Sequence, residues 1–170
     1  MKLKTFTTRE LKSILDNHAK WLRGEYGRRA NLNNANLRES NLSGVDLRYA
    51  CLNGADLSCA DLSSAVLRSS SLKKTNLRGT NLRCAIMSEV DLRGSDLRCA
   101  DLRCSILRES NISKANLSYA MLNDADLSRV NFKKAILRGA DLRCSDLTGI
   151  VLNGVDLSEA YLPENFLIQK

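Results

Sequence analysis

The chain has 170 residues, a formal net charge of +7 at pH 7 and only eight aromatic residues. This length is typical of one domain, and no apolar run is long enough for a transmembrane helix or a secretory signal, so the cytoplasm is the expected compartment. Residues 1–30 hold eight Lys or Arg against three Asp or Glu, whereas residues 31–170 hold 18 against 16, which argues against a strongly acidic or strongly basic body.

Residues 1–30 are predicted to form an N-terminal capping segment. Thr7 and Glu10 have the spacing of a capping box, in which the two side chains satisfy each other's backbone N–H groups. Five apolar residues then fall on one helical face: Leu11, Ile14, Leu15, Ala19 and Leu22. We therefore expect a helix over about residues 8–23, ending near Gly24, whose apolar face covers the end of the structure that follows.

The excess positive charge of this segment has two interpretations. A solvated helix face is the simpler one, and contact with nucleic acid or with an acidic partner is the alternative. His18 is the only histidine. We expect it to serve the cap or the surface rather than catalysis.

Leucine recurs every fifth residue from Leu32 to Leu162. Of these 27 positions, 24 are Leu and the others are Met87, Ile112 and Phe132. Asp or Asn directly precedes 18 of the 27, and a small or β-branched residue stands two before each. A period of five forms a stripe on neither a helix nor a flat strand, so the chain must turn once per repeat. The small residue and Leu then point inward, Asp or Asn points outward, and the last two residues form a corner.

The five-residue repeat defines which residues are expected in the core and which at the corners. Representative core residues are Leu57, Leu77, Leu97, Leu102, Leu117 and Leu142. Seven of the nine glycines stand two after the Leu, where a type II turn requires positive φ. For corners ending in Ser, Cys, Lys or Glu, a type I-like turn is expected instead.

Residues 55–59, 100–104 and 140–144 read ADLSC, ADLRC and ADLRC, and they resemble the A(D/N)LXX repeat of the pentapeptide-repeat family. The resemblance implies an all-β solenoid, a right-handed quadrilateral β-helix with four repeats per coil. About seven coils would occupy residues 31–167, with residues 168–170 as a tail. Some members modulate DNA gyrase as DNA mimics, which is an alternative function here. The near-neutral repeat region disfavours it, because DNA is densely negative.

Five of the six cysteines occupy the corner position two after the Leu. With four repeats per coil, Cys84 and Cys104 are neighbours one coil apart, at about 4.8 Å. We expect both thiols to stay reduced in the cytoplasm, with metal or redox use as the alternative. No catalytic, cofactor or metal motif is recognisable, so no cofactor is expected.

Apolar residues at outward positions are candidate contact surfaces. Val66, Ile86 and Ile106 are spaced by 20 residues and should stack on one face. The C-terminal end has no helix to cover it and carries four candidates: Tyr161, Phe166, Leu167 and Ile168. These either form a plug or join two chains end to end as a homodimer.

The function expected from these features is that of a non-enzymatic, rigid protein-interaction or structural module. Its expected partner is an unidentified protein, with no membrane association. Nucleic-acid binding through the basic N-terminal segment is disfavoured but remains a second alternative.

Overall fold

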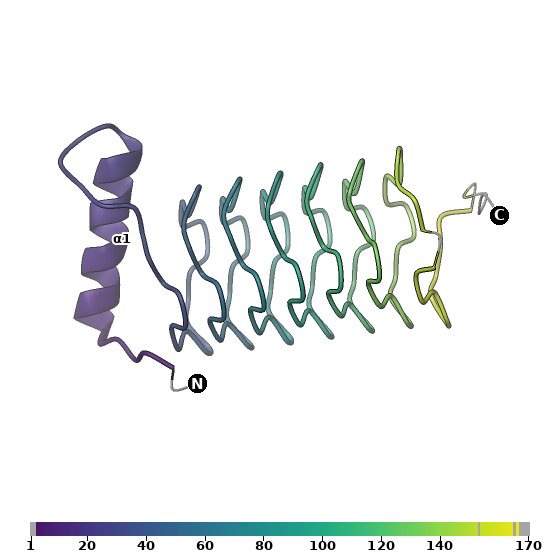
Figure 1. Cartoon of the computed structure of the whole chain (residues 1–170), viewed down its shortest axis with the longest axis horizontal. Coiled ribbons are helices and arrows are strands. Elements are labelled where there is room, and N and C mark those ends of the chain that lie inside the picture. The colour runs from purple at the N-terminus through teal and green to yellow at the C-terminus, as the bar shows by residue number, and fades with distance from the viewer. Residues whose placement is uncertain (1–2, 153, 165, 167–170) are drawn as a thin grey trace.

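The computed structural model describes residues 3–152, 154–164 and 166. Over these residues it is a rod of stacked coils with a single α-helix, α1 (Thr8–Leu22), which lies across the N-terminal end (Figure 1). The chain winds from this end to the opposite one, so that each coil contacts the coils before and after it (Figure 1).

Helix α1 begins and ends with complete capping motifs. Thr7 Oγ1 accepts the Glu10 N–H at 3.2 Å, and Glu10 Oε2 accepts the Thr7 N–H at 2.7 Å. At the other end, Gly24 has φ of +75°, and the Glu25 N–H donates to the Lys20 carbonyl at 3.0 Å, as in a Schellman motif. The helix is one residue shorter than the expected 8–23, and its apolar face packs against the first coil through Leu11, Ile14 and Leu15.

The coils are held together by a ladder of parallel backbone pairs. Outward residues are bridged to the residue 20 positions later, from Asn31 with Cys51 to Asp141 with Tyr161, and Asn131 is the one outward residue in this range without such a bridge. The Leu32 N–H donates to the Cys51 carbonyl at 2.7 Å, and the Cys51 N–H donates to the Ala30 carbonyl at 3.1 Å. The spacing of 20 means that four five-residue repeats complete one coil.

The extreme N-terminus adds one pairing that the sequence does not suggest. Lys4 forms a parallel bridge with Ala35, so the chain before α1 lies along the first coil. The Lys4 N–H donates to the Asn34 carbonyl and the Asn36 N–H donates to the Lys4 carbonyl, both at 2.7 Å. The first coil is therefore covered by both α1 and this short extended segment.

The core is a continuous stack of the repeat leucines. All 24 residues at every fifth position from Leu32 to Leu147 are buried. Exposure is 0% for the six representative leucines Leu57, Leu77, Leu97, Leu102, Leu117 and Leu142. Leu152, Leu157 and Leu162 are only half-buried, although they pack against the same core. Burial is thus complete in the central coils and decreases toward the C-terminal end.

The expectation of two kinds of corner is wrong. All 26 residues in the second corner position, from Asn34 to Glu159, have positive φ, whether or not they are glycine. Cys84 and Cys104, for example, have φ of 54° and 57°. From Leu32 to Leu157, the residue three after each core position of the repeat donates its N–H back to the carbonyl of that position, as Ala35 does to Leu32 at 3.1 Å. The turns therefore have the signs of type II. The ladder imposes one conformation because a type I corner would break the register with the next coil.

The outward Asp and Asn residues are turn caps. In all 18 of them, Oδ1 accepts the backbone N–H of the residue two positions later, at 2.9–3.4 Å. This is the Asx-turn interaction, which holds the chain in the bend it needs at the corner. The turn hydrogen bond therefore explains why Asp or Asn is repeated, without any catalytic or binding role.

Candidate interaction surfaces

One side of the rod carries an unbroken apolar column, formed by Val66, Ile86 and Ile106. Parallel bridges join Val66 to Ile86 and Ile86 to Ile106, so the three side chains stack on consecutive coils. Ile86 and Ile106 are 38% and 39% exposed. A branched aliphatic side chain cannot accept the corner N–H, so each of these positions lacks the turn cap, an interaction of about 1 kcal/mol. The column is therefore an apolar strip, exposed at Ile86 and Ile106 and half-buried at Val66, where the repeat ordinarily places Asp or Asn.

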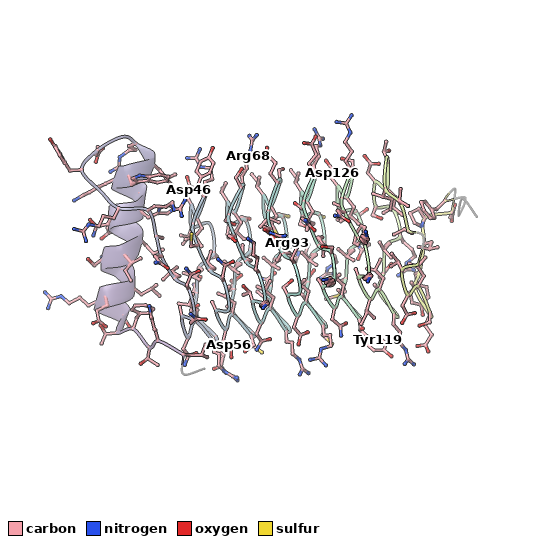
Figure 2. All side chains as sticks on the ribbon, in the orientation of Figure 1. Asp46, Asp56, Arg68, Arg93, Tyr119 and Asp126 are labelled. Carbon is pink, nitrogen blue, oxygen red and sulfur yellow. The ribbon has the colours of Figure 1, made fainter. Side chains whose placement is uncertain are left out.

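Ion pairs between successive coils border this column. Arg68 Nη2 lies 2.8 Å from Glu89 Oε1, and Arg108 Nη2 lies 2.9 Å from Asp126 Oδ2. Arg68 and Asp126 project at the same edge of the rod (Figure 2). Together with Ser88, Ile106 and Glu109, these residues line a groove of about 490 Å³. The side is thus an apolar strip with a rim of mixed charge, whose exposed pairs add little stability.

Other carboxylates of the central coils are neutralised within their own corner. Asp96 and Asp101 each accept a fork of two hydrogen bonds from an arginine two residues later. The hydrogen bond from Arg98 holds the pKa of Asp96 below its usual value, and Arg103 does the same for Asp101. These carboxylates are therefore committed to ion pairs and turn caps.

The described residues of the C-terminal end include exposed and half-buried apolar side chains. Tyr161 is 58% exposed, and the Arg143 guanidinium carbon lies 5.4 Å from the centre of its ring. Phe166 is half-buried and packs against the core of its own chain. Leu167 and Ile168, the other two candidates at this end, lie outside the described residues. The described part of the end thus combines a partial plug with accessible apolar surface.

His18 joins α1 to the first coil. Its side chain is fully buried, Nδ1 accepts the Ala30 N–H at 3.1 Å, and Nε2 has no hydrogen-bond partner among the described residues. The ring stacks on Trp21 at 5.7 Å, and Trp21 in turn meets the edge of Tyr49. Nothing in the sequence distinguishes a buried, packing histidine from an exposed one, so this contact appears only in the fold.

Lowering the pH is expected to destabilise the N-terminal cap. Burial holds the pKa of His18 below its ordinary 6.5, against an opposing effect of Asp46. As the pH falls, His18 therefore takes up a proton in the unfolded chain before it does so in the folded chain. Its contribution to the free energy of unfolding is complete above pH 6.5 and is lost as the pH falls from there toward the pKa of His18 in the folded chain. The free energy of unfolding then changes by at most about 1.4 kcal/mol per pH unit, because one proton is involved.

Urea denaturation between pH 7.5 and pH 5, followed by Trp21 fluorescence, measures this dependence. His18→Gln keeps an acceptor for Ala30 and should flatten the curve in that window. Asp46, the carboxylate that acts on His18, interferes little, because the hydrogen bonds from Arg48 outweigh its burial and hold its pKa below the ordinary 3.8. Equal pH dependence in the two proteins would show that His18 is not the responsible group.

The thiols of Cys84 and Cys104 are both exposed, on consecutive coils of one edge. Within the described residues, no group of three or more His, Cys, Asp or Glu side chains is arranged to hold a metal ion. None of the helices in the described part is long and apolar enough to cross a bilayer.

The ladder of five-residue repeats defines the class as a β-solenoid. The sequence profile of the family described as "Pentapeptide repeats" matches in eight copies, over residues 28–58, 60–98, 95–133, 110–149 and 135–164. These matches cover most of the chain, and the chain belongs to the pentapeptide-repeat family. This confirms the resemblance seen in the sequence.

Solved structures of other repeat proteins are similar in part. A pentapeptide-repeat protein from the Arabidopsis thaliana thylakoid lumen is 24% identical, with 62% of this chain and 70% of that chain covered and a TM-score of 0.45. Rfr23 from the cyanobacterium Cyanothece 51142 is 27% identical, with 79% and 81% covered and a TM-score of 0.39. QnrB1, a plasmid-mediated fluoroquinolone resistance protein, is 18% identical, with 75% and 81% covered and a TM-score of 0.40. Similarity at this level carries no argument about function, and the comparison with curated proteins gave no match.

Proposed function

We propose that this protein is a non-enzymatic interaction module, a rigid rod that presents one side to a protein partner. The column of Val66, Ile86 and Ile106 carries the proposal, because three consecutive coils replace a turn cap by an outward aliphatic side chain, and Ile86 and Ile106 are exposed. An apolar centre with a charged rim is the common composition of a protein–protein contact surface. We also take from the family that the rod is a right-handed quadrilateral β-helix.

The charges of the coils favour a protein partner over DNA mimicry and over DNA binding by the coils. Asp96 and Asp101 are paired with arginines, and Arg68 and Arg108 are paired with carboxylates. A DNA mimic needs a continuous row of free negative charge, and a DNA-binding surface needs free positive charge. The paired charges along these coils supply neither.

Replacing Ile86 and Ile106 together by Asn is expected to abolish partner binding while leaving the fold intact. Asn restores a turn cap like those of Asn76 and Asn81, so stability should change by no more than about 1 kcal/mol. Two central apolar contacts each contribute more than about 1.4 kcal/mol to such an interface, so affinity should fall at least 100-fold.

The measurement has two stages, with Ile136→Asn as the matched control. Ile136 is also an outward isoleucine, 38% exposed, but it lies on another side of the rod. A partner captured by the wild type and by the control, but not by the double variant, is purified and its affinity for all three is measured. A partner that binds the double variant as tightly as the wild type would exclude this side as the contact surface.

We further propose that two chains associate through their C-terminal ends. Leu157 and Leu162 remain half-buried there, so within the described residues the last coil leaves core side chains partly accessible to a second chain. Phe166 packs on its own chain, so it covers only part of this end.

Light scattering over a range of concentrations should therefore give twice the mass of one 18.9 kDa chain. Phe166→Asp should return the mass to that of a monomer, because a charge would be buried without a partner at the contact. A monomer at every concentration would contradict the dimer and favour the plug, in which the chain covers its own end. A dimer that survives Phe166→Asp would have to form through another surface.

A further inference from the structure

One edge of the rod is a basic ridge. Its corners on four consecutive coils carry six cationic side chains: Lys73, Lys74, Arg93, Lys114, Lys133 and Lys134. The Lys74 N–H donates to the Arg93 carbonyl and the Lys114 N–H donates to the Lys133 carbonyl, both at 3.0 Å, so these corners stack along the rod. Neither corner position of this edge holds an Asp or Glu anywhere from Asn33 to Lys134. The repeat region, although near neutral in total, thus carries a ridge of one sign.

Most of the charge on this basic ridge is unpaired. Asp91 contacts Lys73 at 3.2 Å and Arg93 at 2.8 Å. Among the described residues, the four other lysines of the ridge form no ion pair. On the next edge, by contrast, Arg138 is paired with Glu159 at 2.8 Å. Unpaired charges of one sign reinforce each other's field, so the ridge favours an anionic partner.

The backbone ladder is open beside the C-terminal end of the ridge. Asn131 has no bridge to the next coil, although Asp126 and Ile136 on the adjoining faces are both bridged to the residue 20 positions later. Val151, which would pair with Asn131 in an unbroken ladder, is 74% exposed. The last two coils are therefore joined on the faces to either side of Asn131 but not at Asn131 itself.

This opening leaves two backbone groups without a partner. Within the described part of the chain, the Val130 carbonyl accepts no hydrogen bond and the Phe132 N–H donates none. On the preceding coil, the equivalent groups of Ser110 and Ile112 pair with the N–H and carbonyl of Asn131 at 2.9 and 3.0 Å. Val130 and Phe132 therefore present the carbonyl and the N–H that would hold one residue of a parallel strand.

A groove of about 460 Å³ adjoins these two groups. Arg129 and Lys133, which flank the open segment, line this groove together with Val151 of the next coil. Arg129 is within 3.4 Å of Glu109, so Lys133 is the unpaired cation of the groove. The side chains of the two core residues beside Asn131 are buried, so the groove has room for a backbone and small side chains but not for bulky ones.

We propose that this open corner binds an acidic, extended peptide segment of a partner protein. One residue of the segment donates its N–H to the Val130 carbonyl and accepts the Phe132 N–H, in the place that Val151 would have in an unbroken ladder. Carboxylates further along the segment contact Lys133 and Lys134. Addition of a strand to an exposed backbone edge is a common mode of peptide recognition, and the lysines select for acidic sequences.

The open backbone pair favours a peptide over a nucleic acid. A phosphate backbone could contact the lysines, but it has no alternating N–H and carbonyl groups to match Val130 and Phe132. No aromatic residue stands at the corners of the ridge, so unpaired bases would have no ring on which to stack. The site is also separate from the apolar column, because Ile86 and Ile106 belong to another face of the rod.

Fluorescence anisotropy of a labelled, end-blocked peptide EEAVAEE, titrated with the full chain at low ionic strength, tests the site. The central valine takes the paired position and the alanines beside it are small. Replacing Lys114 and Lys134 together by Glu should weaken binding about 10-fold or more, because each attraction becomes a repulsion. Both variants should fold, since Glu89 and Glu109 occupy the same corner position with the same positive φ.

Two controls separate this site from general charge and from the apolar column. Replacing Arg9 and Lys12 by Glu changes the net charge equally, on exposed positions of α1, and should leave binding unchanged. Replacing Ile86 and Ile106 by Asn should also leave it unchanged. Methylation of the peptide's valine nitrogen removes one donor without changing any charge, and it should weaken binding about 10-fold. Hydrogen exchange at the Phe132 amide should slow only with the unmethylated peptide.

Several outcomes would overturn the proposal. The first is the absence of binding by the wild type, or an equal loss in the α1 control. The second is undiminished binding of the methylated peptide together with unchanged exchange at Phe132, which would exclude strand addition. The third is tighter binding of a thymidine oligonucleotide of the same charge, lost on replacing Lys114 and Lys134, which would make the ridge a nucleic-acid surface instead.

Discussion

Replacing Leu97 by alanine is expected to lower the free energy of unfolding by about 3–5 kcal/mol. Leu97 is completely buried in a central coil, and its N–H donates to the Asn116 carbonyl at 2.7 Å. The hydrogen bonds of the ladder fix the distance between coils on both sides, so neighbouring leucines cannot move in to fill the space. The cavity therefore persists, and its cost adds to the lost burial of the side chain.

Chemical denaturation followed by far-ultraviolet circular dichroism measures this loss. Leu157→Ala is the matched control, because Leu157 has the same place in its coil but is only half-buried at the C-terminal end. We expect it to cost about half as much or less, since a partly exposed leucine has less burial to lose. Equal costs at the two positions would mean that the end of the rod is covered as well as its centre, as in a tight dimer.

Replacing Gly27 by alanine is expected to detach the N-terminal cap, with a cost of about 3 kcal/mol, the upper part of the range for overpacking. A Cβ at Gly27 would lie 2.3 Å from the Asn17 carbonyl oxygen and 2.5 Å from the Trp21 nitrogen. Both obstacles are backbone atoms of α1, which cannot rotate away as a side chain would. The helix would have to leave the first coil, and the bond from the Arg28 N–H to the Asn17 carbonyl, now 3.2 Å, would be lost.

The fluorescence of Trp21 and hydrogen exchange at Ala30 report on the cap, since His18 joins these two residues. Gly24→Ala provides the contrast. Gly24 has φ of +75° but no atom within 4 Å of the added Cβ, so it should cost only about 1 kcal/mol of backbone strain. A Gly27→Ala protein as stable as Gly24→Ala, with an unchanged Trp21 signal, would contradict the close packing of the cap.

Much of the architecture could be predicted from the repeat alone. A period of five requires a turn in every repeat, and the two-residue spacing of Ala100 and Leu102 places both side chains on one side. Both are fully buried, and Asp101 between them points outward and caps the corner. The capping box of Thr7 and Glu10 could also be predicted from the sequence, because its two residues are three positions apart. These features depend only on contacts within one or two repeats.

Other features could not be predicted because their causes lie in distant parts of the chain. The left-handed backbone of Cys84 is intrinsically unfavourable for a residue with a Cβ, and it is imposed by the pairing of its coil with the next one. The burial of His18 depends on Ala30, and the pairing of Lys4 depends on Ala35. The groove beside Ile106 likewise needs Arg68 and Asp126, which are separated by almost three coils of sequence.

The sequence by itself determined which side chains face inward, where the chain turns and where the helix begins. Each of these follows from steric and hydrogen-bonding preferences that act over about five residues. Only the tertiary structure decided that four repeats close a coil, that every corner is left-handed, and that Cys84 leads to Cys104 and Ile86 to Ile106 along one edge. The physical reason is the backbone ladder, because the hydrogen bonds between residues 19 to 21 positions apart select the one corner geometry that keeps all coils in register.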